Sequence, residues 1–520
     1  MSRFLLIIYQ KVSTSILATL CVFFALLISV DSFSQSGEIV EIEHADVLEL
    51  INNDTAQIRK LIGHVRLRQD NMIFSCDSAY QFIENNYVDA YGHVHILQGD
   101  TFDLRGDTLH YYGNNEMAYM TGHVNLRDRA MHLTTDKLDF DLKNNMASYF
   151  NGGTLINEGS TLTSYSGSYY TTSKKAYFKK EVKLVNPDYT LESDTLAYHT
   201  KSKIAWFFGP TRITSKENII YCESGWYDTK NEIAEFVKNA RLNNPPQSIE
   251  ADTLHYERNT GSGLARHHVV FTDTAKDMTI YCMMADYNEH TQSVLATGMP
   301  ILINKVGPDS LYLAADTLLS IKDTTKQIRT LYAFHHVQLF KNNLQGVCDS
   351  LVWNDEDSCL YFLKDPILWS DSSQYTADTI KLGIKKGHID KVWLLQHALI
   401  GSESAKGIYD QIGGRKITGL FRQDTLQQVL VDGNGESIYF AKDEHQAFIG
   451  VNRATCSHII IYFVKNQIDQ IVFMGQPEAT LYPMQKIKLE EFMLDNFIWH
   501  GPIRPISFNN LPGAQQIRKY

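Results

Sequence analysis

The stretch GHVHILQGDTFDLRGDTLHYY (Gly92–Tyr112) brings histidines and aspartates close together and so raises the question of a metal or catalytic site. Its apolar residues point to a structural role instead, because they alternate with polar ones as in a strand that buries one face. Leu104 lies three residues before Asp107, whereas Leu109 and Tyr111 lie two and four residues after it. A strand that changes the parity of its buried residues needs a bend or bulge, so we predict a corner at Asp107.

Both halves of this stretch recur along the chain. A first word, of which AYGHV (Ala90–Val94) is one copy, has its glycine slot at positions 63, 92, 122, 152, 180, 209, 238, 267, 298, 335, 364 and 396. A second word, of which ADTLHY (Ala251–Tyr256) is one copy, lies about half a period later and carries the aspartate of the predicted corner. The glycine slots mostly step by 28–32 residues. Two words that share one period indicate a repeat protein.

The pattern predicts an all-β fold built as a repetitive, solenoid-like stack of about twelve bent strand units of roughly 29 residues. We expect each unit to add one strand spacing, about 4.8 Å, and to contribute to one continuous apolar lining. We expect the glycine slot and the aspartate corner to lie on opposite sides of each unit. The richness in aromatic residues agrees with β structure, and the formal net charge of −11 without a basic cluster argues against nucleic-acid binding.

The cysteines follow the same repeat. The small slot before the aspartate is filled in four units by Cys76, Cys222, Cys282 and Cys348, and no two of these units are adjacent. These four cysteines are therefore expected to be buried and unpaired, because their units lie beyond disulfide reach. The state of the remaining two, Cys359 and Cys456, is left open.

The ends of the chain differ from the repeat. Residues 1–34 read as a secretory signal peptide with an apolar core at Ile16–Val30, an uncleaved anchor being the alternative. The β repeat is assigned to residues 35–400, and residues 401–476 to continuing β structure or a cap. Residues 477–520 are expected to form an irregular tail, with Lys488–Ile498 as a candidate short helix and a Pro-Gly-rich end that frays.

The words ADTLHY and A-x-G-x-V resemble the OstA/LptA-like repeat of the lipopolysaccharide-transport proteins over roughly residues 40–400. The resemblance implies an open β-jellyroll, or β-taco, that holds lipopolysaccharide acyl chains inside the fold and is not an enzyme. It further implies a periplasmic protein, with association with the outer membrane as an alternative, and no cofactor is predicted. Implied partners are lipopolysaccharide or a similar acylated glycolipid and other transport components joined by edge-to-edge strand pairing, with homo-oligomers also open. The last 120 residues match neither the short soluble bridge protein nor the membrane-embedded subunit of that pathway.

If the lining holds lipid, alternate residues of the first units should face it. The candidate lipid-binding residues are Val65, Leu67, Phe74, Val94, Ile96, Leu104, Val124, Leu126 and Leu133. The same residues would equally suit a closed protein core, and the sequence leaves that alternative open.

A search for chemistry finds no catalytic motif and predicts no catalytic residue. His93 and His95 could share one face as metal ligands, but no third partner can be named, so no metal site is predicted. Two other functions stay open: a β-solenoid enzyme acting on polysaccharide, and an exported structural or adhesive repeat protein with a filled core.

Overall fold

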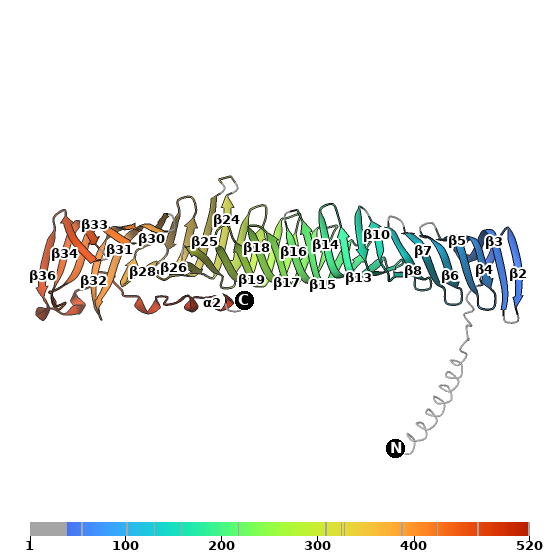
Figure 1. The fold of residues 1–520 in the computed structure, drawn as a ribbon. Coiled ribbons are helices and arrows are strands. Elements are labelled where there is room, and N and C mark those ends of the chain that lie inside the picture. The colour runs from blue at the N-terminus through green and yellow to red at the C-terminus, as the bar shows by residue number, and fades with distance from the viewer. Residues whose placement is uncertain are drawn as a thin grey trace, which may run out of the picture. The chain divides into compact units, whose positions relative to one another are not determined.

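The computed structural model describes residues 39–517 apart from residues 54–55, 100–101, 129–130, 158, 217, 307–308, 324, 327, 386–387, 424 and 465–466. The predicted signal peptide lies outside the described residues. Almost all of the described chain forms antiparallel β strands, which confirms the predicted all-β repeat fold (Figure 1). The chain divides into two compact units, unit 1 up to Asn151 and unit 2 from Gly152.

Unit 1 is a run of hairpins in which β1 and β2 both pair with β3, and each strand from β3 to β8 pairs with the next along the chain. Its strands are β1 (Glu41–His44), β2 (Val47–Asn53), β3 (Ala56–Gln69), β4 (Met72–Phe82), β5 (Tyr87–Gln98), β6 (Phe102–Tyr112), β7 (Met117–Asp128), β8 (Met131–Asp141) and β9 (Met146–Tyr149). Strands β3 to β8 are 11 to 14 residues long, and each is interrupted near its middle.

The interruption is a β-bulge that combines both sequence words. Between β5 and β6, Gly92 and His93 lie opposite the single residue Asp107, and both have left-handed backbone, with φ of 76° and 42°. A Cβ atom on Gly92 would lie 2.3 Å from Asp77 Oδ2 of β4. Glycine suits this position because it avoids that clash and because it adopts left-handed backbone readily. Positive φ occurs at all twelve predicted slots, whether glycine or not.

Two expectations about the repeat unit are wrong. The glycine and aspartate words do not lie on opposite sides of a unit: they meet at the same corner, since His93 Nδ1 lies 2.8 Å from Asp77 Oδ2. One period spans two antiparallel strands, because each word marks the middle of a different strand. Each unit therefore adds two strand spacings, about 9.5 Å rather than 4.8 Å.

The corners fold every strand into two halves that face each other. We name them from β5: Tyr87–Tyr91 belongs to half-sheet A and Val94–Gln98 to half-sheet B. The phase of burial changes at the corner, so the alternate buried residues of both halves point inward. The row of corners closes one side of the fold, and the hairpin loops surround the opposite side, which we call the mouth.

Unit 2 continues the pattern with more interruptions. Its first strands are β10 (Gly153–Asn157), β11 (Ser160–Ser164), β12 (Ser166–Tyr170), β13 (Lys175–Val185), β14 (Tyr189–His199), β15 (Ile204–Ser215), β16 (Ile219–Asp228), β17 (Ile233–Asn244), β18 (Gln247–Glu257), β19 (Ser262–Asp273) and β20 (Met278–Asn288). Where a corner is irregular, the two halves of one strand are separate strands. These are β21 (Ser293–Thr297), β22 (Ile301–Val306), β23 (Asp309–Ala314), β24 (Thr317–Asp323), β25 (Ile328–Lys341), β26 (Leu344–Asn354), β27 (Cys359–Leu363), β28 (Ile367–Ser370), β29 (Ser373–Thr376) and β30 (Thr379–Lys385).

The region after residue 400 keeps the corner geometry with longer strands. These strands are β31 (His388–Ala405), β32 (Ile408–Arg422), β33 (Thr425–Lys442), β34 (Phe448–Val464), β35 (Gln467–Met474) and β36 (Glu478–Pro483). Left-handed pairs recur at Gly433–Asn434 and Gly475–Gln476, so the corner signal continues beyond the twelfth slot. The assignment of a separate region from residue 401 stays a prediction.

Residues 484–517, which we call the strap, run back along unit 2 from the β34–β36 end to the neighbourhood of β20 (Figure 1). The strap holds the short helices η1 (Met484–Lys486), η2 (Leu489–Glu491), η3 (Gly501–Ile503), η4 (Phe508–Asn510) and α2 (Ala514–Ile517). The candidate helix at Lys488–Ile498 contains only the 3-10 turn η2. The expectation that the end of the tail frays is wrong for the described residues, because buried Phe492, Leu494 and Leu511 anchor the tail.

The cysteines of the described part are unpaired. Cys76, Cys222, Cys282 and Cys348 are buried as predicted, and burial raises the pKa of each thiol to about 12. Cys359 is also buried and Cys456 is half-buried, which resolves the two cases that the sequence left open.

Candidate functional site

All nine candidate lining residues are buried and lie in unit 1. Their exposed fractions are at most 4%, and Leu104, Ile96 and Leu126 are fully enclosed. They come from half-sheet B of strands β3 to β8 and face half-sheet A. Their inward placement agrees with the pattern from which they were chosen, but their contact with lipid stays a prediction.

The interior of unit 1 is filled by aromatic side chains that bridge the two half-sheets. The ring of Phe74 from half-sheet B lies 4.9 Å from that of Tyr111 from half-sheet A. Phe102 and Phe140 form a second bridge, stacked at 4.7 Å. The Tyr111 hydroxyl also donates a hydrogen bond of 2.7 Å to Gln69 Oε1 at the far end of half-sheet B. These contacts join the half-sheets into one packed core.

The chain just before β1 crosses the mouth of unit 1 at its first strands. Val40 is 2% exposed and lies between the ends of the two half-sheets. Its N–H donates to Asn86 Oδ1 at 3.2 Å, and its carbonyl accepts from Gln81 Nε2 at 2.7 Å. Glu41, the next residue, pairs with Arg68 of half-sheet B, so the backbone crosses from one half-sheet to the other. Polar backbone groups of the crossing segment are thereby satisfied within a buried place.

Unit 2 contains a cleft between its half-sheets at strands β10 to β16. Its apolar lining consists of Leu155, Leu162, Phe178, Leu184, Leu191, Leu196, Ala205 and Phe207. The cavity measures about 190 Å³. The aromatic contact here differs from those of unit 1, because Phe207 stacks at 6.5 Å on Phe236, which belongs to the same half-sheet. This pair lies within one half-sheet and does not itself cross the space between the two.

Polar residues line the mouth of this cleft. Asn186 Nδ2 donates to Ser160 Oγ at 3.0 Å, and Lys203 lies on the opposite side. Tyr189 and Tyr227 meet edge to face at 6.3 Å across the mouth, and burial raises the pKa of Tyr189 to about 12. Apolar walls below a polar rim can hold an amphipathic molecule with its apolar part inside.

The sequence pattern pointed to unit 1 for lipid contacts, whereas the cleft at β10–β16 lies in unit 2. The alternation of apolar residues identifies which side chains face inward in both units. It carries no information on whether facing side chains meet, because that depends on pairs such as Phe74 and Tyr111, which are far apart in sequence. For this reason, sequence analysis did not identify the residues of the cleft.

The strap is held on the outer face of half-sheet B by three buried glutamines at one repeat position. Gln411 exchanges hydrogen bonds with the backbone of Phe492 and Leu494, at 3.1 and 2.8 Å. Gln374 does the same with Ile498 O and His500 N, both at 2.7 Å.

The third glutamine, Gln345, accepts a hydrogen bond at its Oε1 from Arg504 Nε of the strap, at 2.9 Å. The exposed fractions of Gln345, Gln374 and Gln411 are 3%, 2% and 1%. Each stands four residues before an aspartate slot, at positions 349, 378 and 415. That shared spacing is the signal by which sequence analysis could have found them.

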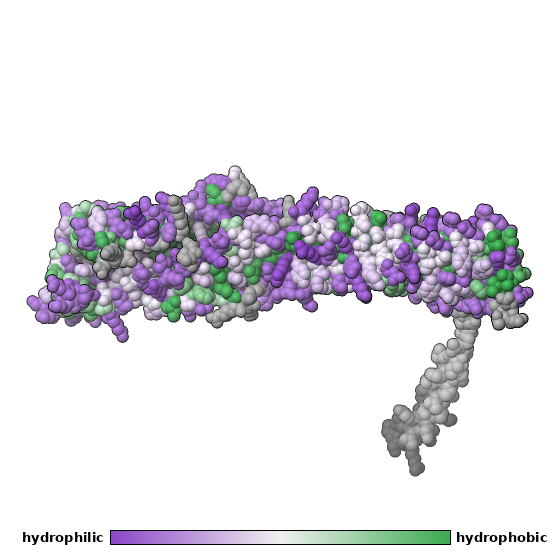
Figure 2. Space-filling model, viewed as in Figure 1, coloured by the Kyte–Doolittle hydropathy of each residue, from purple (hydrophilic) through white to green (hydrophobic). Residues whose placement is uncertain are grey.

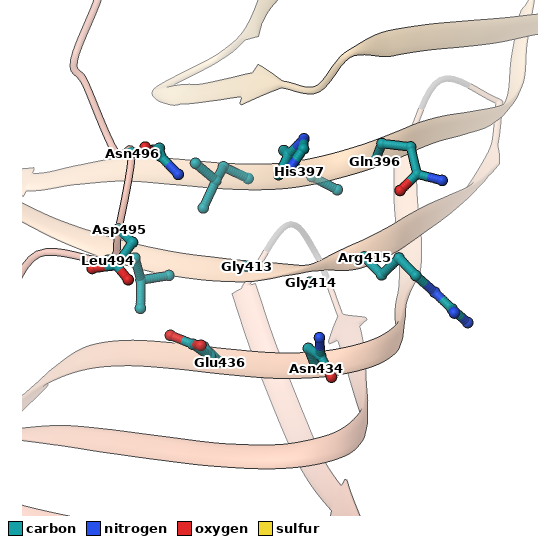
Figure 3. Close-up of a pocket in the computed structure, with 12 residues that line it drawn as sticks. Gln396, His397, Gly413, Gly414, Arg415, Asn434, Glu436, Leu494, Asp495 and Asn496 are labelled. Atoms are coloured by element: carbon teal, nitrogen blue, oxygen red, sulfur yellow. The ribbon is translucent and has the colours of Figure 1, made fainter.

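A second cleft lies where the strap passes β31 to β33 (Figure 3). It measures about 260 Å³ and combines Leu494, Asp495 and Asn496 of the strap with polar residues of the corners. Arg415 stands there in an aspartate slot, with Glu436 on the neighbouring strand. The labelled side chains lie along separate strands and do not converge on one point (Figure 3). The arrangement indicates a seam beside the strap.

Histidines and aspartates pair along the corners. In unit 1, His64, His93 and His123 bind Asp46, Asp77 and Asp107 at 2.8, 2.8 and 2.7 Å. The bond to the carboxylate raises the pKa of each of these exposed histidines. Each of these histidines is the second left-handed residue of its bulge, with φ between 42° and 44°.

The two candidate metal ligands engage different carboxylates. His93 bonds to Asp77, whereas His95 Nε2 lies 3.1 Å from Asp103 Oδ1 without hydrogen-bond geometry. Within the described ranges, no group of three or more His, Cys, Asp or Glu side chains is arranged to hold a metal ion. The absence of a catalytic or metal site stays a prediction.

The comparison with known families bears directly on this fold. The family described as "OstA-like protein" matches residues 37–194 and 190–252. Residues 37–252 form an OstA-like domain. This confirms the resemblance seen in the repeat words, and the OstA-like segment includes both the filled interior of unit 1 and the cleft at β10–β16 of unit 2.

The comparisons with curated proteins and with solved structures add less. No curated protein matches the chain. Among solved structures, that of LptH, described as the LptA homologous periplasmic component of the conserved lipopolysaccharide transport device from Pseudomonas aeruginosa, is 13% identical. The match covers 23% of this chain and 82% of LptH, with a TM-score of 0.20. In the part of the chain that the structure describes, no helix combines the length and apolar character needed to span a bilayer.

Proposed function

We propose that this protein binds the acyl chains of lipopolysaccharide or a similar glycolipid in the cleft at β10–β16, as a periplasmic carrier in transport to the outer membrane. The observation that carries the proposal is the apolar space between the half-sheets, with polar residues at its mouth. The OstA-like family assignment and the repeat words support the same function.

The chemistry of the cleft fits an acylated glycolipid. Removing acyl chains from water into a space lined by leucine and phenylalanine is favourable in proportion to the apolar area buried, about 25 cal/mol per Å². The rim offers Lys203, Asn186 and Tyr189 to the polar part of the molecule. No step of this process breaks a covalent bond, so the protein would act as a carrier and not as an enzyme.

Photo-crosslinking tests the proposal. Benzoylphenylalanine is placed at Leu184, which lines the cleft, and in a matched variant at Tyr177, which lies on the outer face of the same strand β13. Each full-length variant is mixed with purified lipopolysaccharide and irradiated. We expect a glycolipid adduct at position 184 and little at position 177. A folded 184 variant without an adduct, or equal adducts at both positions, would overturn the proposal.

Transport partners form a second part of the proposal. We infer that edge strands β1–β2 or β35–β36 pair with other components of the transport pathway or with a second copy. Leu50 of β2 and Leu481 of β36 are 67% and 58% exposed, and hydrophobic side chains gather over β2 (Figure 2). Strand edges with exposed apolar side chains favour pairing. Sedimentation over a range of concentrations would reveal self-association, and concentration-independent monomers would exclude it.

A further inference from the structure

The outer face of half-sheet A in unit 1 is an aromatic surface. In register across β4, β5, β6 and β7, its outward side chains form rows. The aromatic members, which we call the tyrosine face, are Tyr80, Phe82, Tyr87, Tyr91, Tyr112 and Tyr119. Six aromatic residues within four adjacent strands call for an explanation.

The rings of this face are arranged in a connected row. Tyr87 lies 5.2 Å from Phe82 and 4.6 Å from Tyr112, measured between ring centroids. Tyr112 in turn meets Tyr119 edge to face at 5.9 Å. Tyr112 and Tyr91 are 42% and 38% exposed, so ring surface is available to a ligand. The row of Phe82, Tyr87 and Tyr112 is next to the hairpin loops, at the rim of the mouth.

Hydrogen-bonding groups stand between the rings. Asp89 pairs in register with Tyr80 on one side and with His110 on the other. Tyr87 Oη lies 3.0 Å from His110 Nδ1 and also donates to Asp89. The aromatic rings of the surface can therefore stack on the C–H face of a flat ring. The carboxylate, imidazole and phenol groups between them can bond to hydroxyls.

The other outer face of the same strands lacks these features. Half-sheet B of β3 and β6 presents charged residues that pair with one another, such as Arg66 with Glu43 at 2.7 Å and Arg105 with Asp103 at 3.0 Å. The aromatic character is thus confined to half-sheet A. Behind it lie the buried residues Leu109 and Ala118, which face the interior of unit 1.

We propose that the tyrosine face binds the uncharged sugar units of the glycolipid's oligosaccharide. Sugars present alternate C–H faces and hydroxyl edges, which is the complement of alternating aromatic rings and hydrogen-bonding groups. The aspartates on and beside the face, Asp89 and Asp139, disfavour a phosphate-rich membrane surface. The inference rests on the proposed function for the source of the sugar, and it needs no acyl chain at this face.

In the test, the full-length protein is mixed with the fully deacylated saccharide of lipopolysaccharide. Binding is measured by saturation-transfer NMR and by titration. We expect saturation of the sugar protons by the wild type and about fivefold weaker binding in Tyr112→Ala, the loss of one aromatic contact. Tyr91→Ser serves as a second variant at an exposed position. Arg105→Ala, on the other half of the same strand as Tyr112, is the matched control and should bind as the wild type does.

The outcomes separate this inference from the proposed function. Absence of saccharide binding, or equal binding in Tyr112→Ala and wild type, overturns the sugar site, whereas the adduct at position 184 would still report acyl-chain binding. Self-association that is lost in Tyr112→Ala, without saccharide binding, would overturn it in favour of a second copy of the chain. Weakened saccharide binding with an unchanged adduct at position 184 supports it.

Discussion

Unit 1 and the first strands of unit 2 follow the same repeat, yet aromatic pairs cross the interior of unit 1, whereas in unit 2 a cleft lies between the half-sheets. In unit 1, aromatic bridges such as Phe74–Tyr111 join the half-sheets, and the chain at Val40 crosses the mouth at the first strands. In unit 2, Phe207 stacks within its own half-sheet. The repeat therefore fixes the backbone, and the size and direction of a few side chains decide whether the interior serves stability or binding.

The largest expected effect compares leucines at one repeat position, three residues before an aspartate slot. Leu104→Ala in unit 1 should lower the free energy of unfolding by about 3–4 kcal/mol, because it leaves a cavity in a packed core. Leu191→Ala should cost roughly 1 kcal/mol less, because Leu191 already borders empty space. Denaturant unfolding followed by hydrogen exchange in each unit would measure both. Equal losses would contradict the distinction between the packed core of unit 1 and the cleft of unit 2.

The next largest effect is expected in the strap. A variant that loosens the strap shows whether the outer face of unit 2 influences the cleft in its interior. Gln374→Ala leaves Ile498 O and His500 N without their 2.7 Å partners, which should cost about 1–3 kcal/mol locally. We expect faster hydrogen exchange across the strap and an unchanged glycolipid adduct at position 184. Gln427→Ala, at an exposed glutamine, is the control. A lost adduct would mean that the strap shapes the cleft.

A smaller effect is expected from the bridge across unit 1. Tyr111→Phe keeps the ring against Phe74 but removes the hydroxyl that donates to Gln69, at a cost of about 1 kcal/mol. The exposed Tyr112→Phe should change little. Thermal unfolding of the two variants provides the measurement, and an equal effect of both would show that the buried hydrogen bond contributes nothing.

The smallest effect concerns pH. The carboxylate partners raise the pKa of His64, His93 and His123 above the ordinary 6.5, so the folded form of unit 1 binds these protons more tightly. Their stabilisation is present below pH 6.5 and is lost as pH rises through the higher pKa values of the folded state.

The triple variant His64→Gln, His93→Gln, His123→Gln should remove this pH dependence from unit 1. The corners at Lys180–Glu181 and Lys238–Asn239 contain no histidine, so peptides from those strands should show no such dependence. Urea midpoints at pH 6 and pH 8, resolved by hydrogen exchange, are the measurement. A pH response that persists in the variant would exclude the corner histidines as its source.

The corners could be predicted because their physics is local. The change of phase around Asp107 requires a bulge, and a left-handed residue at the bulge favours glycine, so two short words marked all twelve slots. The inward direction of residues such as Leu104 and Val124 follows from alternation alone. The height of a unit was misjudged because alternation does not show where one strand ends and the antiparallel one begins.

The candidate site was harder to predict because its features are not local. Whether the interior is filled depends on rings from different half-sheets, such as Phe102 and Phe140, which are 38 residues apart. Gln374 looks like an ordinary surface residue until its bonds to the strap, more than 120 residues later, are known. Such pairings follow from the three-dimensional arrangement and leave only a faint repeat spacing in the sequence.

The strap also sets an order in time. Every strand that it covers, from β20 to β34, precedes it in the chain, so each is synthesised before the strap. Until then Ile301 and Ala314, which pack under Leu511 in the finished fold, lie uncovered on the outer face of half-sheet B. An apolar surface that is exposed during folding favours aggregation and chaperone binding. A protein built from local hairpins thus completes its fold through one late, long-range step.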